Sequence, residues 1–316
     1  MGSNRKLRRL LYAPMMYIAF CTVAGIYLAD GSLHPPRRTL TEEETAAFRH
    51  SVDVLNGQLQ DVAITSADGL ALQGWMVTSP HSNEEAVLLL HGLGDNRLGM
   101  TGYAQFLLAN GFTVLLPDAR AHGNSGGSLA TFGLLERKDI TQWVQFLQAQ
   151  TKARCVYGMG ESMGAAQLLQ SLSSGARFCA IIAESSFSTF REIAYDRMGQ
   201  PFHLGPWVGR TFLWAVVESA FLRARWKYGL DMDNASPEDS VARTQVPVLL
   251  IHGQVDSNIP VRHSRLIHEW APNTSLWEVP GADHCGALNT APDQFKRVLL
   301  TWFSRGSPLM KRIAVQ

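Results

Sequence analysis

The stretch Gly160-Glu161-Ser162-Met163-Gly164 stands between a short apolar run at 154–157 and a helix-like segment at 163–173. It matches the pattern G-x-S-x-G in the strand–turn–helix context that gives this pattern its meaning. The turn is sharp, so a glycine on each side lets the strand and the helix approach without a Cβ clash. We therefore predict that the Ser162 hydroxyl is exposed at a helix N-terminus. The alternative is a serine that only caps a helix.

Short apolar runs recur along the rest of the chain, and most are bounded by Gly, Pro or Asp. The turn Asp68-Gly69 between the first two runs is typical of a hairpin. Helix-like segments at 96–110, 134–150 and 163–173 separate later runs, which predicts right-handed crossovers. We expect an α/β fold, with a mostly parallel eight-stranded sheet covered by helices on both faces. The predicted strands are 61–65, 71–78, 86–90, 112–116, 154–157, 179–183, 246–251 and 274–279.

One interval is several times longer than a normal crossover. About sixty residues separate the run ending at 183 from the run beginning at 246. The segment 187–228 carries Trp207, Trp214 and Trp226 and has a helix-like periodicity. We interpret residues 187–243 as a helical cap inserted over the edge of the sheet.

The N-terminus has the length of a membrane-spanning helix. Leu10–Ala29 is twenty residues without a charge, which as a helix covers about 30 Å, the thickness of a bilayer's hydrocarbon core. Basic residues precede it, at Arg5, Lys6, Arg8 and Arg9, and favour a cytoplasmic N-terminus. We predict an anchor at 1–30, a polar linker at 31–57 and an extracytoplasmic catalytic domain at 58–316, in a single-pass membrane protein.

Two other interpretations of this segment stay open. A cleaved signal peptide would use a small-x-small site such as Val23-Ala24-Gly25. Alternatively, the segment is a hydrophobic arm that does not span the membrane.

Composition excludes several functions. The net charge of +1 gives no basic field for nucleic acid. The four cysteines form no CxxC pair and no zinc pattern. Cys155 and Cys179 lie in predicted strands and are interpreted as small buried hydrophobic residues, although a disulfide stays open. His91 and His252 each follow a buried strand, and we expect them to bind loop backbone rather than a metal.

A serine hydroxyl needs a base that takes its proton. Asp256 follows the strand at 246–251, and His284 follows the last strand, so both emerge at the same edge as Ser162. The order Ser, Asp, His fits a nucleophile elbow. Asp118, which precedes the serine, is expected to order its own loop, and Asp283 is expected to point elsewhere.

The oxyanion of an acyl-transfer intermediate needs hydrogen-bond donors. The first is the Met163 amide, directly after the nucleophile. For the second we select the Leu93 amide, within the glycine-rich bend His91-Gly92-Leu93-Gly94.

These motifs resemble the α/β-hydrolase superfamily, specifically its serine-aminopeptidase-like (S33-type) branch, which contains many membrane-anchored hydrolases. The resemblance runs from about Asp61 to Phe303 and includes the loop from Asp118 to Gly126. In that loop, Ala121 stands where the family usually has Gly. The resemblance implies hydrolysis of an ester, thioester or amide without a cofactor or metal.

We predict a serine esterase or thioesterase (EC 3.1 rather than EC 3.4) that acts on a small-molecule or lipid-like acyl substrate. The aromatic-rich cap and the membrane location favour an apolar acyl group. One alternative is a serine aminopeptidase or amidase, which would need a carboxylate cluster for an α-amine. The candidate carboxylates for that role are Asp231, Asp233, Glu238 and Asp239. The other alternative is a non-catalytic binding protein of the same fold.

Overall fold

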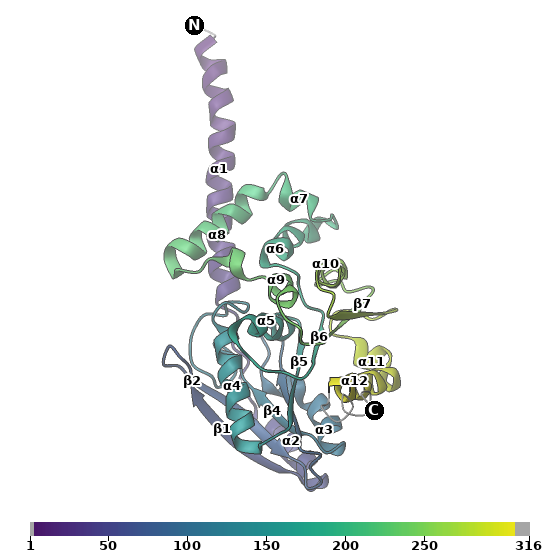
Figure 1. The fold of residues 1–316 in the computed structure, drawn as a ribbon. Coiled ribbons are helices and arrows are strands. Elements are labelled where there is room, and N and C mark those ends of the chain that lie inside the picture. The colour runs from purple at the N-terminus through teal and green to yellow at the C-terminus, as the bar shows by residue number, and fades with distance from the viewer. Residues whose placement is uncertain (1–2, 307–316) are drawn as a thin grey trace. The chain divides into compact units, whose positions relative to one another are not determined.

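The computed structural model describes residues 3–306, and the chain forms two compact units (Figure 1). Unit 1 consists of the described residues up to His34 together with Thr189–Ala235. Unit 2 consists of Pro35–Ser188 and the chain from Ser236 onward. Residues 307–316 of the predicted catalytic domain lie outside the described residues.

Unit 2 is built on one eight-stranded sheet in the order β1-β2-β4-β3-β5-β6-β7-β8. β1 pairs with β2 and β2 with β4 in antiparallel fashion, and all other pairs are parallel. The predicted α/β-hydrolase architecture is confirmed, and each predicted run overlaps one strand. The strands are β1 (Gln58–Thr65), β2 (Ala71–Thr78), β3 (Glu85–Leu90), β4 (Thr113–Pro117), β5 (Cys155–Glu161), β6 (Ile181–Glu184), β7 (Val248–Gly253) and β8 (Thr274–Val279).

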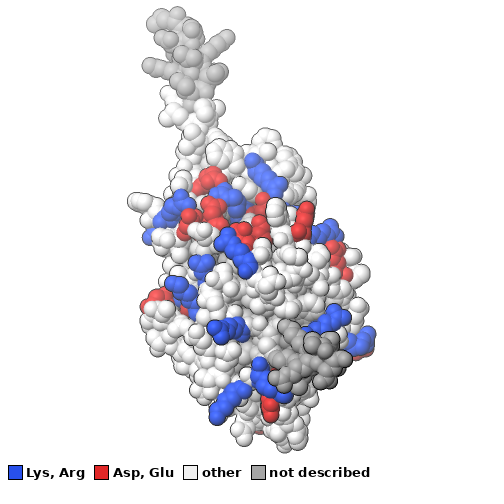
Figure 2. Space-filling model, viewed as in Figure 1, with Lys and Arg blue, Asp and Glu red and all other residues white. Residues whose placement is uncertain are grey.

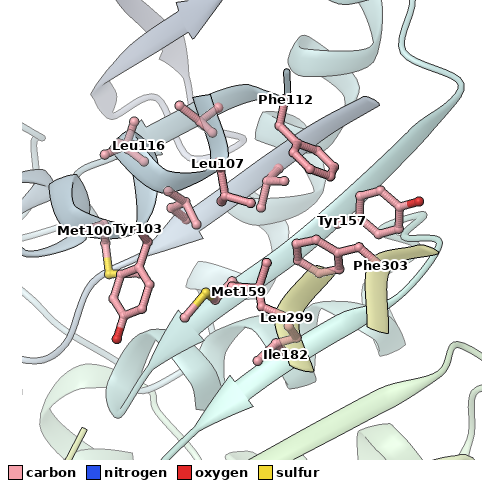
Figure 3. Packing of buried hydrophobic residues seen from close by; sticks show 14 of the residues in the cluster. Met100, Tyr103, Leu107, Phe112, Leu116, Tyr157, Met159, Ile182, Leu299 and Phe303 are labelled. Carbon is pink, nitrogen blue, oxygen red and sulfur yellow. The ribbon is translucent and has the colours of Figure 1, made fainter. Parts of the chain in front are cut away.

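Helices cover both faces of this sheet, so its central strands are apolar on both sides. One face packs against α2 (Glu42–Val54), α3 (Thr101–Ala109) and α12 (Pro292–Gly306). Figure 3 shows part of this core, where the rings of Tyr157 and Phe303 stack with centroids 4.4 Å apart. The other face packs against α4 (Glu136–Thr151), α5 (Met163–Ser171), α9 (Pro237–Ala242) and α10 (Arg262–Trp270). The short helix α11 (Ala287–Thr290) precedes α12.

The prediction of a linker at 31–57 missed helix α2. Thr41 caps it: the Thr41 hydroxyl accepts a hydrogen bond from the Glu44 amide at 3.2 Å and donates one to the Glu44 carboxylate at 2.7 Å. Phe48 and Val52 are buried in the core of unit 2. The Thr-x-x-Glu capping box was present in the sequence and is the signal that could have found this helix.

The interpretation of Cys155 and Cys179 as separate buried residues was wrong, because the two form a disulfide. Cys155 begins β5 and Cys179 precedes β6, the strand beside it, and the Cys179 amide donates to Val156 O at 2.9 Å. This pairing brings the two Cα atoms to 5.7 Å, within the range that a disulfide requires. Cys21 and Cys285 are free.

The described residues of unit 1 form helices joined by turns and short loops. Its long helix α1 (Ser3–Leu33) packs along α8 (Trp214–Tyr228). Gly25 makes this approach feasible, because a Cβ there would lie 2.5 Å from the Ser219 Cβ. Helices α6 (Phe190–Gly199) and α7 (Trp207–Arg210) complete the unit, with short 3-10 turns at Gln200–Phe202 and Met232–Asn234.

Within α1, the segment Tyr12–Leu33 is long and apolar enough to cross a membrane, with a mean hydropathy of 1.5. Only 17% of its most apolar window is buried against the rest of the protein, unlike the core helix of a globular domain. The side chains at 5–9, on which the predicted orientation depends, lie outside the described residues.

Candidate active site

Ser162 occupies the sharp turn that joins β5 to α5. Its backbone has φ 51° and ψ −115°, a strained conformation for a residue other than glycine, and its amide donates to Glu184 O at 2.8 Å. Gly164 is required here, because a Cβ would lie 2.4 Å from Leu90 O. At Gly160, a Cβ would lie 2.7 Å from Gly164 C. The flanking glycines therefore permit the turn, as the sequence predicted.

Three side chains from distant parts of the chain meet at this turn. His284 Nε2 lies 2.9 Å from Ser162 Oγ, and His284 Nδ1 lies 2.9 Å from Asp256 Oδ2. Ser162 follows β5, Asp256 follows β7 and His284 follows β8, each at the carboxyl end of a parallel strand. The geometry allows the imidazole to accept the hydroxyl proton while the carboxylate orients the ring and stabilises its cationic form.

Asp256 is buried and is held by several donors. Its Oδ1 accepts from the amides of Asn258 at 2.9 Å and Ile259 at 2.8 Å. Burial acts to raise the pKa of Asp256, but hydrogen bonds from His252 and His284 outweigh it, and the pKa lies well below its usual range. The carboxylate is therefore charged at neutral pH.

The two alternative acids lie elsewhere in hydrogen-bond networks of their own. Asp118 accepts from the Arg97 side chain at 2.6 Å and from the Asn124 amide at 2.7 Å, so it orders its own loop as predicted. Asp283 accepts from the amides of Ser257 and His284, both at 2.8 Å. Neither carboxylate contacts the His284 ring.

The two predicted oxyanion donors belong to segments next to the nucleophile. Met163 is the first residue of α5, so its amide has no partner within the helix. Leu93 lies in the turn between Gly92 and Asp95, where the Asp95 amide contacts Gly92 O at 3.4 Å. A Cβ on Gly92 would lie 3.6 Å from the Ser162 Cβ, so this turn runs next to the serine. The part that either amide plays remains a prediction.

His91 and His252 have the structural roles expected of them. His91 Nδ1 lies 2.8 Å from Gly92 O, and its Nε2 accepts from the Ala119 amide at 3.1 Å. Burial lowers the pKa of His91 to about 4, so its ring is neutral. His252 Nε2 lies 2.7 Å from Ile259 O. Its additional contact with Asp256, at 3.3 Å, was not predicted.

A pair of glutamates next to the serine, the partly buried Glu161 and the buried Glu184, also escaped prediction, which gave Glu161 only a local polar contact. The Tyr103 hydroxyl donates to Glu161 and lies 3.4 Å from Glu184 Oε2. Burial raises the pKa of Glu161 to about 7 and that of Glu184 to about 8. Glu184 ends the buried strand β6, and a charged residue at that place was the available signal.

A metal site and a separate cavity are the other features considered in the described part of unit 2. Within residues 3–306, no group of three or more His, Cys, Asp or Glu side chains is arranged to hold a metal. A cavity of about 390 Å³ near the start of α2 is not lined by the serine, the histidine or Asp256. Its walls are Leu40, Thr41, Glu42, Thr45, Ala46, Arg49, Asp61, Trp75, Arg97 and Asn124.

Comparison with known proteins agrees with this architecture. Residues 87–298 match the model of the alpha/beta hydrolase family. The chain belongs to this family. Among its relatives, the uncharacterized protein YqkD of Bacillus subtilis is 32% identical over 65% of this chain and 66% of its own length. The uncharacterized protein YfhR of Escherichia coli is 26% identical over 90% of both chains.

The yeast relative YNL320W, described as an uncharacterized membrane protein of Saccharomyces cerevisiae, is 19% identical over 88% of this hydrolase and 91% of its own length. Among solved structures, the Pyrococcus furiosus esterase Pf2001 has a TM-score of 0.66 at 24% identity, covering 87% of this chain and 98% of that one. An acylaminoacyl peptidase of Pyrococcus horikoshii has a TM-score of 0.59 at 16% identity, covering 79% and 42%. At these identities, the likeness establishes the fold.

Proposed function

We propose that this alpha/beta hydrolase is a serine hydrolase that cleaves a carboxylic ester or thioester through an acyl-enzyme on Ser162. The observation that carries the proposal is the continuous hydrogen-bonded series from Ser162 Oγ through both ring nitrogens of His284 to Asp256, with both ring-nitrogen contacts at 2.9 Å. A hydroxyl, an imidazole and a buried carboxylate in this order are the components of nucleophilic acyl transfer.

The reaction proceeds in two halves. His284 takes the Ser162 proton as Oγ attacks the acyl carbonyl, and the amides of Met163 and Leu93 donate to the oxyanion. The protonated His284 then gives its proton to the leaving alcohol or thiol, which leaves the acyl group on Oγ. In the second half, His284 deprotonates a water that attacks the acyl-enzyme, and the carboxylic acid is released with the serine restored.

An ester or thioester is favoured over an aminoacyl substrate because two of the carboxylates proposed to hold an α-amine are already paired with arginines. Asp231 contacts Arg225 at 2.7 Å, and Asp233 contacts Arg191 at 2.6 Å. Recognition of an ammonium group would require breaking these ion pairs. Glu238 and Asp239 lie in the first turn of α9, where carboxylates complement the helix dipole.

We also propose that α1 anchors the protein in a membrane with unit 2 outside the cytoplasm. The apolar segment Tyr12–Leu33 supports an anchor. The disulfide between Cys155 and Cys179 supports an oxidising compartment, since such bonds are rare in the cytosol. Extraction of membranes at alkaline pH tests the anchor: the full-length protein is expected in the pellet, and release into the supernatant would contradict anchoring.

A fluorophosphonate probe tests the nucleophile. Labelling is expected in the wild type and in Ser257→Ala, which removes a hydroxyl beside Asp283, but not in Ser162→Ala. Undiminished labelling of Ser162→Ala would overturn the assignment. Nitrophenyl esters of varied chain length, assayed beside aminoacyl nitroanilides, test the substrate class. Turnover of the nitroanilides alone would favour the peptidase alternative.

A further inference from the structure

The side of α1 that faces α8 is polar at one end. Asp30, near the C-terminus of α1, accepts hydrogen bonds from Arg223 at 3.0 Å, Lys227 at 3.1 Å and the Tyr228 hydroxyl at 2.8 Å. We call these four residues the Asp30 cluster. In Figure 2, the white stretch of α1 next to its grey end carries no charged side chain. Blue and red side chains gather further along the helix, where Asp30 pairs with Arg223 and Lys227. The Asp30 cluster therefore marks a level that suits water and lipid headgroups.

The other end of the contact has the opposite character. The Tyr17 hydroxyl donates to the backbone oxygen of Phe212 at 2.5 Å. Tyr17 precedes Asp30 by thirteen residues, which is about 20 Å along a helix. The chain around Phe212 is thus held beside the N-terminal part of the apolar segment Tyr12–Leu33, roughly 20 Å along α1 from the Asp30 cluster.

Five large apolar side chains are exposed around Phe212. We call residues 201–214 the aromatic tip; they lie between α6 and α8, include α7 and end at the first residue of α8. Its one Lys or Arg, Arg210, pairs with Glu192 of α6. An exposed apolar surface of this kind marks contact with a membrane or a partner. The exposed fractions are Phe202 62%, Leu204 44%, Trp207 49%, Phe212 65% and Trp214 51%.

We propose that the aromatic tip inserts into the lipid leaflet that α1 enters, with the Asp30 cluster at the water side. This inference rests on the membrane anchorage proposed above. Large apolar side chains such as Phe and Leu are favourable within the hydrocarbon core of a bilayer, which is the depth that the Tyr17 contact gives to the tip. In this arrangement α1 and the aromatic tip, which are far apart in the sequence, lie in the membrane at the same depth.

Lipid is favoured over a second copy of the chain because the apolar surface continues along α1. Met15, Met16, Ile18 and Phe20 are all at least 60% exposed, and they flank Tyr17, which contacts the tip. Acyl chains cover both surfaces at once and need no specific shape. A second copy seated on the tip alone would leave the α1 residues uncovered.

Quenching of tryptophan fluorescence by brominated lipid tests the insertion on the full-length protein. The protein is reconstituted in phosphatidylcholine vesicles with or without bromine on the acyl chains. The double variant Trp207→Phe/Trp214→Phe is compared with Trp270→Phe. Trp270 is a matched control because it is 69% exposed but belongs to unit 2.

The wild type is expected to lose fluorescence on brominated vesicles, and the double variant to lose most of that bromine-dependent change. Trp270→Phe is expected to retain the change in full. Equal quenching of the wild type and the double variant would overturn tip insertion, while the anchor itself is tested separately by flotation of the same vesicles. If the tip tryptophans are not quenched and cross-linking yields dimers in the vesicles, the apolar surface contacts a second copy of the chain instead.

Discussion

Nε2 of His252 lies 3.3 Å from Oδ2 of Asp256, the carboxylate oxygen that also contacts the His284 ring. The other nitrogen, Nδ1, lies 2.7 Å from Ser264 Oγ, whose hydroxyl donates to it in the tautomer that carries hydrogen on Nε2. That hydrogen is shared between Ile259 O and Asp256. A second histidine therefore supports the charged form of the proposed triad acid.

Replacement of this ring should weaken catalysis more than its distance from the serine suggests. In His252→Phe we expect kcat/KM for a nitrophenyl ester to fall roughly tenfold, because one hydrogen bond to a charged group contributes about 1.5 kcal/mol. Ser264→Ala is the control, because it perturbs the same ring but leaves Nε2 next to Asp256. An equal loss in both variants, measured below their melting temperatures, would reduce His252 to a packing role.

Asp256 and Asp283 provide a contrast between neighbouring carboxylates. Asp256→Asn should lower kcat on the order of 10³- to 10⁴-fold, because an amide cannot stabilise the imidazolium of His284. Asp283→Asn should change kcat little, since its carboxylate contacts Ser257 and the backbone of His284 rather than the ring. Steady-state kinetics on both variants decide the assignment, and a reversed order would move the acid to Asp283.

The buried Glu184 should make stability depend on pH. Its Oε1 accepts from the Ala287 amide at 3.0 Å, while Oε2 faces the Tyr103 hydroxyl, so a proton on Oε2 can be donated to that hydroxyl. Burial is the largest cause of its raised pKa of about 8, and the nearby Glu161 and Asp256 charges add to it. The unfolded chain loses this proton near pH 4.5, its usual value.

Between these two values the folded protein keeps a proton that the unfolded chain releases. The stabilising contribution of Glu184 is therefore complete below about pH 4.5 and is lost as the pH rises toward about 8. Glu184→Gln has no such proton, so its melting temperature should rise relative to wild type as the pH increases from about 5 to about 8. Thermal denaturation at several pH values measures the difference, and a constant difference would contradict burial of a neutral acid.

The strands and the proposed triad were predictable because their signals are local. A buried strand is a short apolar run, and each of Ser162, Asp256 and His284 directly follows such a run. Since the carboxyl ends of parallel strands lie at one edge of a sheet, position along the chain was enough to bring the three together. The sharp turn at Ser162 was likewise visible in its glycines.

The contacts that escaped prediction depend on which strands are neighbours and on side-chain direction. Strand order places β5 beside β6, and that neighbour relation, which no spacing reveals, joins Cys155 to Cys179. Tyr103 comes from α3 and meets two glutamates from β5 and β6 only in the folded core. The capping box of α2 is a different case, because it was legible in the sequence.

The disulfide determines how many cysteines a thiol reagent can modify. In protein purified without reductant and then denatured, a maleimide reagent should modify Cys21 and Cys285 only, and all four cysteines after reduction. Cys155→Ala/Cys179→Ala should lower the free energy of unfolding by about 2–4 kcal/mol. Mass spectrometry gives the number of labels, and four labels without reductant would show that the bond does not form.

Ala121 offers a stabilising change at a place where the sequence departs from the pattern of the family that it resembles. Its φ is 62°, and its amide donates to Gly126 O at 2.9 Å, so the backbone is held in the left-handed region. That conformation costs a non-glycine residue about 1–2 kcal/mol, more than the ~0.5–1 kcal/mol of entropy that glycine loses on folding.

Ala121→Gly should therefore raise the free energy of unfolding by about 0.5–1 kcal/mol and leave kcat unchanged. Ala130→Gly is the matched control, since Ala130 is also a buried loop alanine but does not have a positive φ. In Ala130→Gly, the glycine makes the unfolded chain more flexible but relieves no backbone strain in the folded protein, so the free energy of unfolding should fall. Denaturant unfolding of the two variants beside wild type measures both signs. If Ala121→Gly loses as much stability as Ala130→Gly, the packing of the Ala121 methyl group contributes more than the backbone strain costs, and the prediction is wrong.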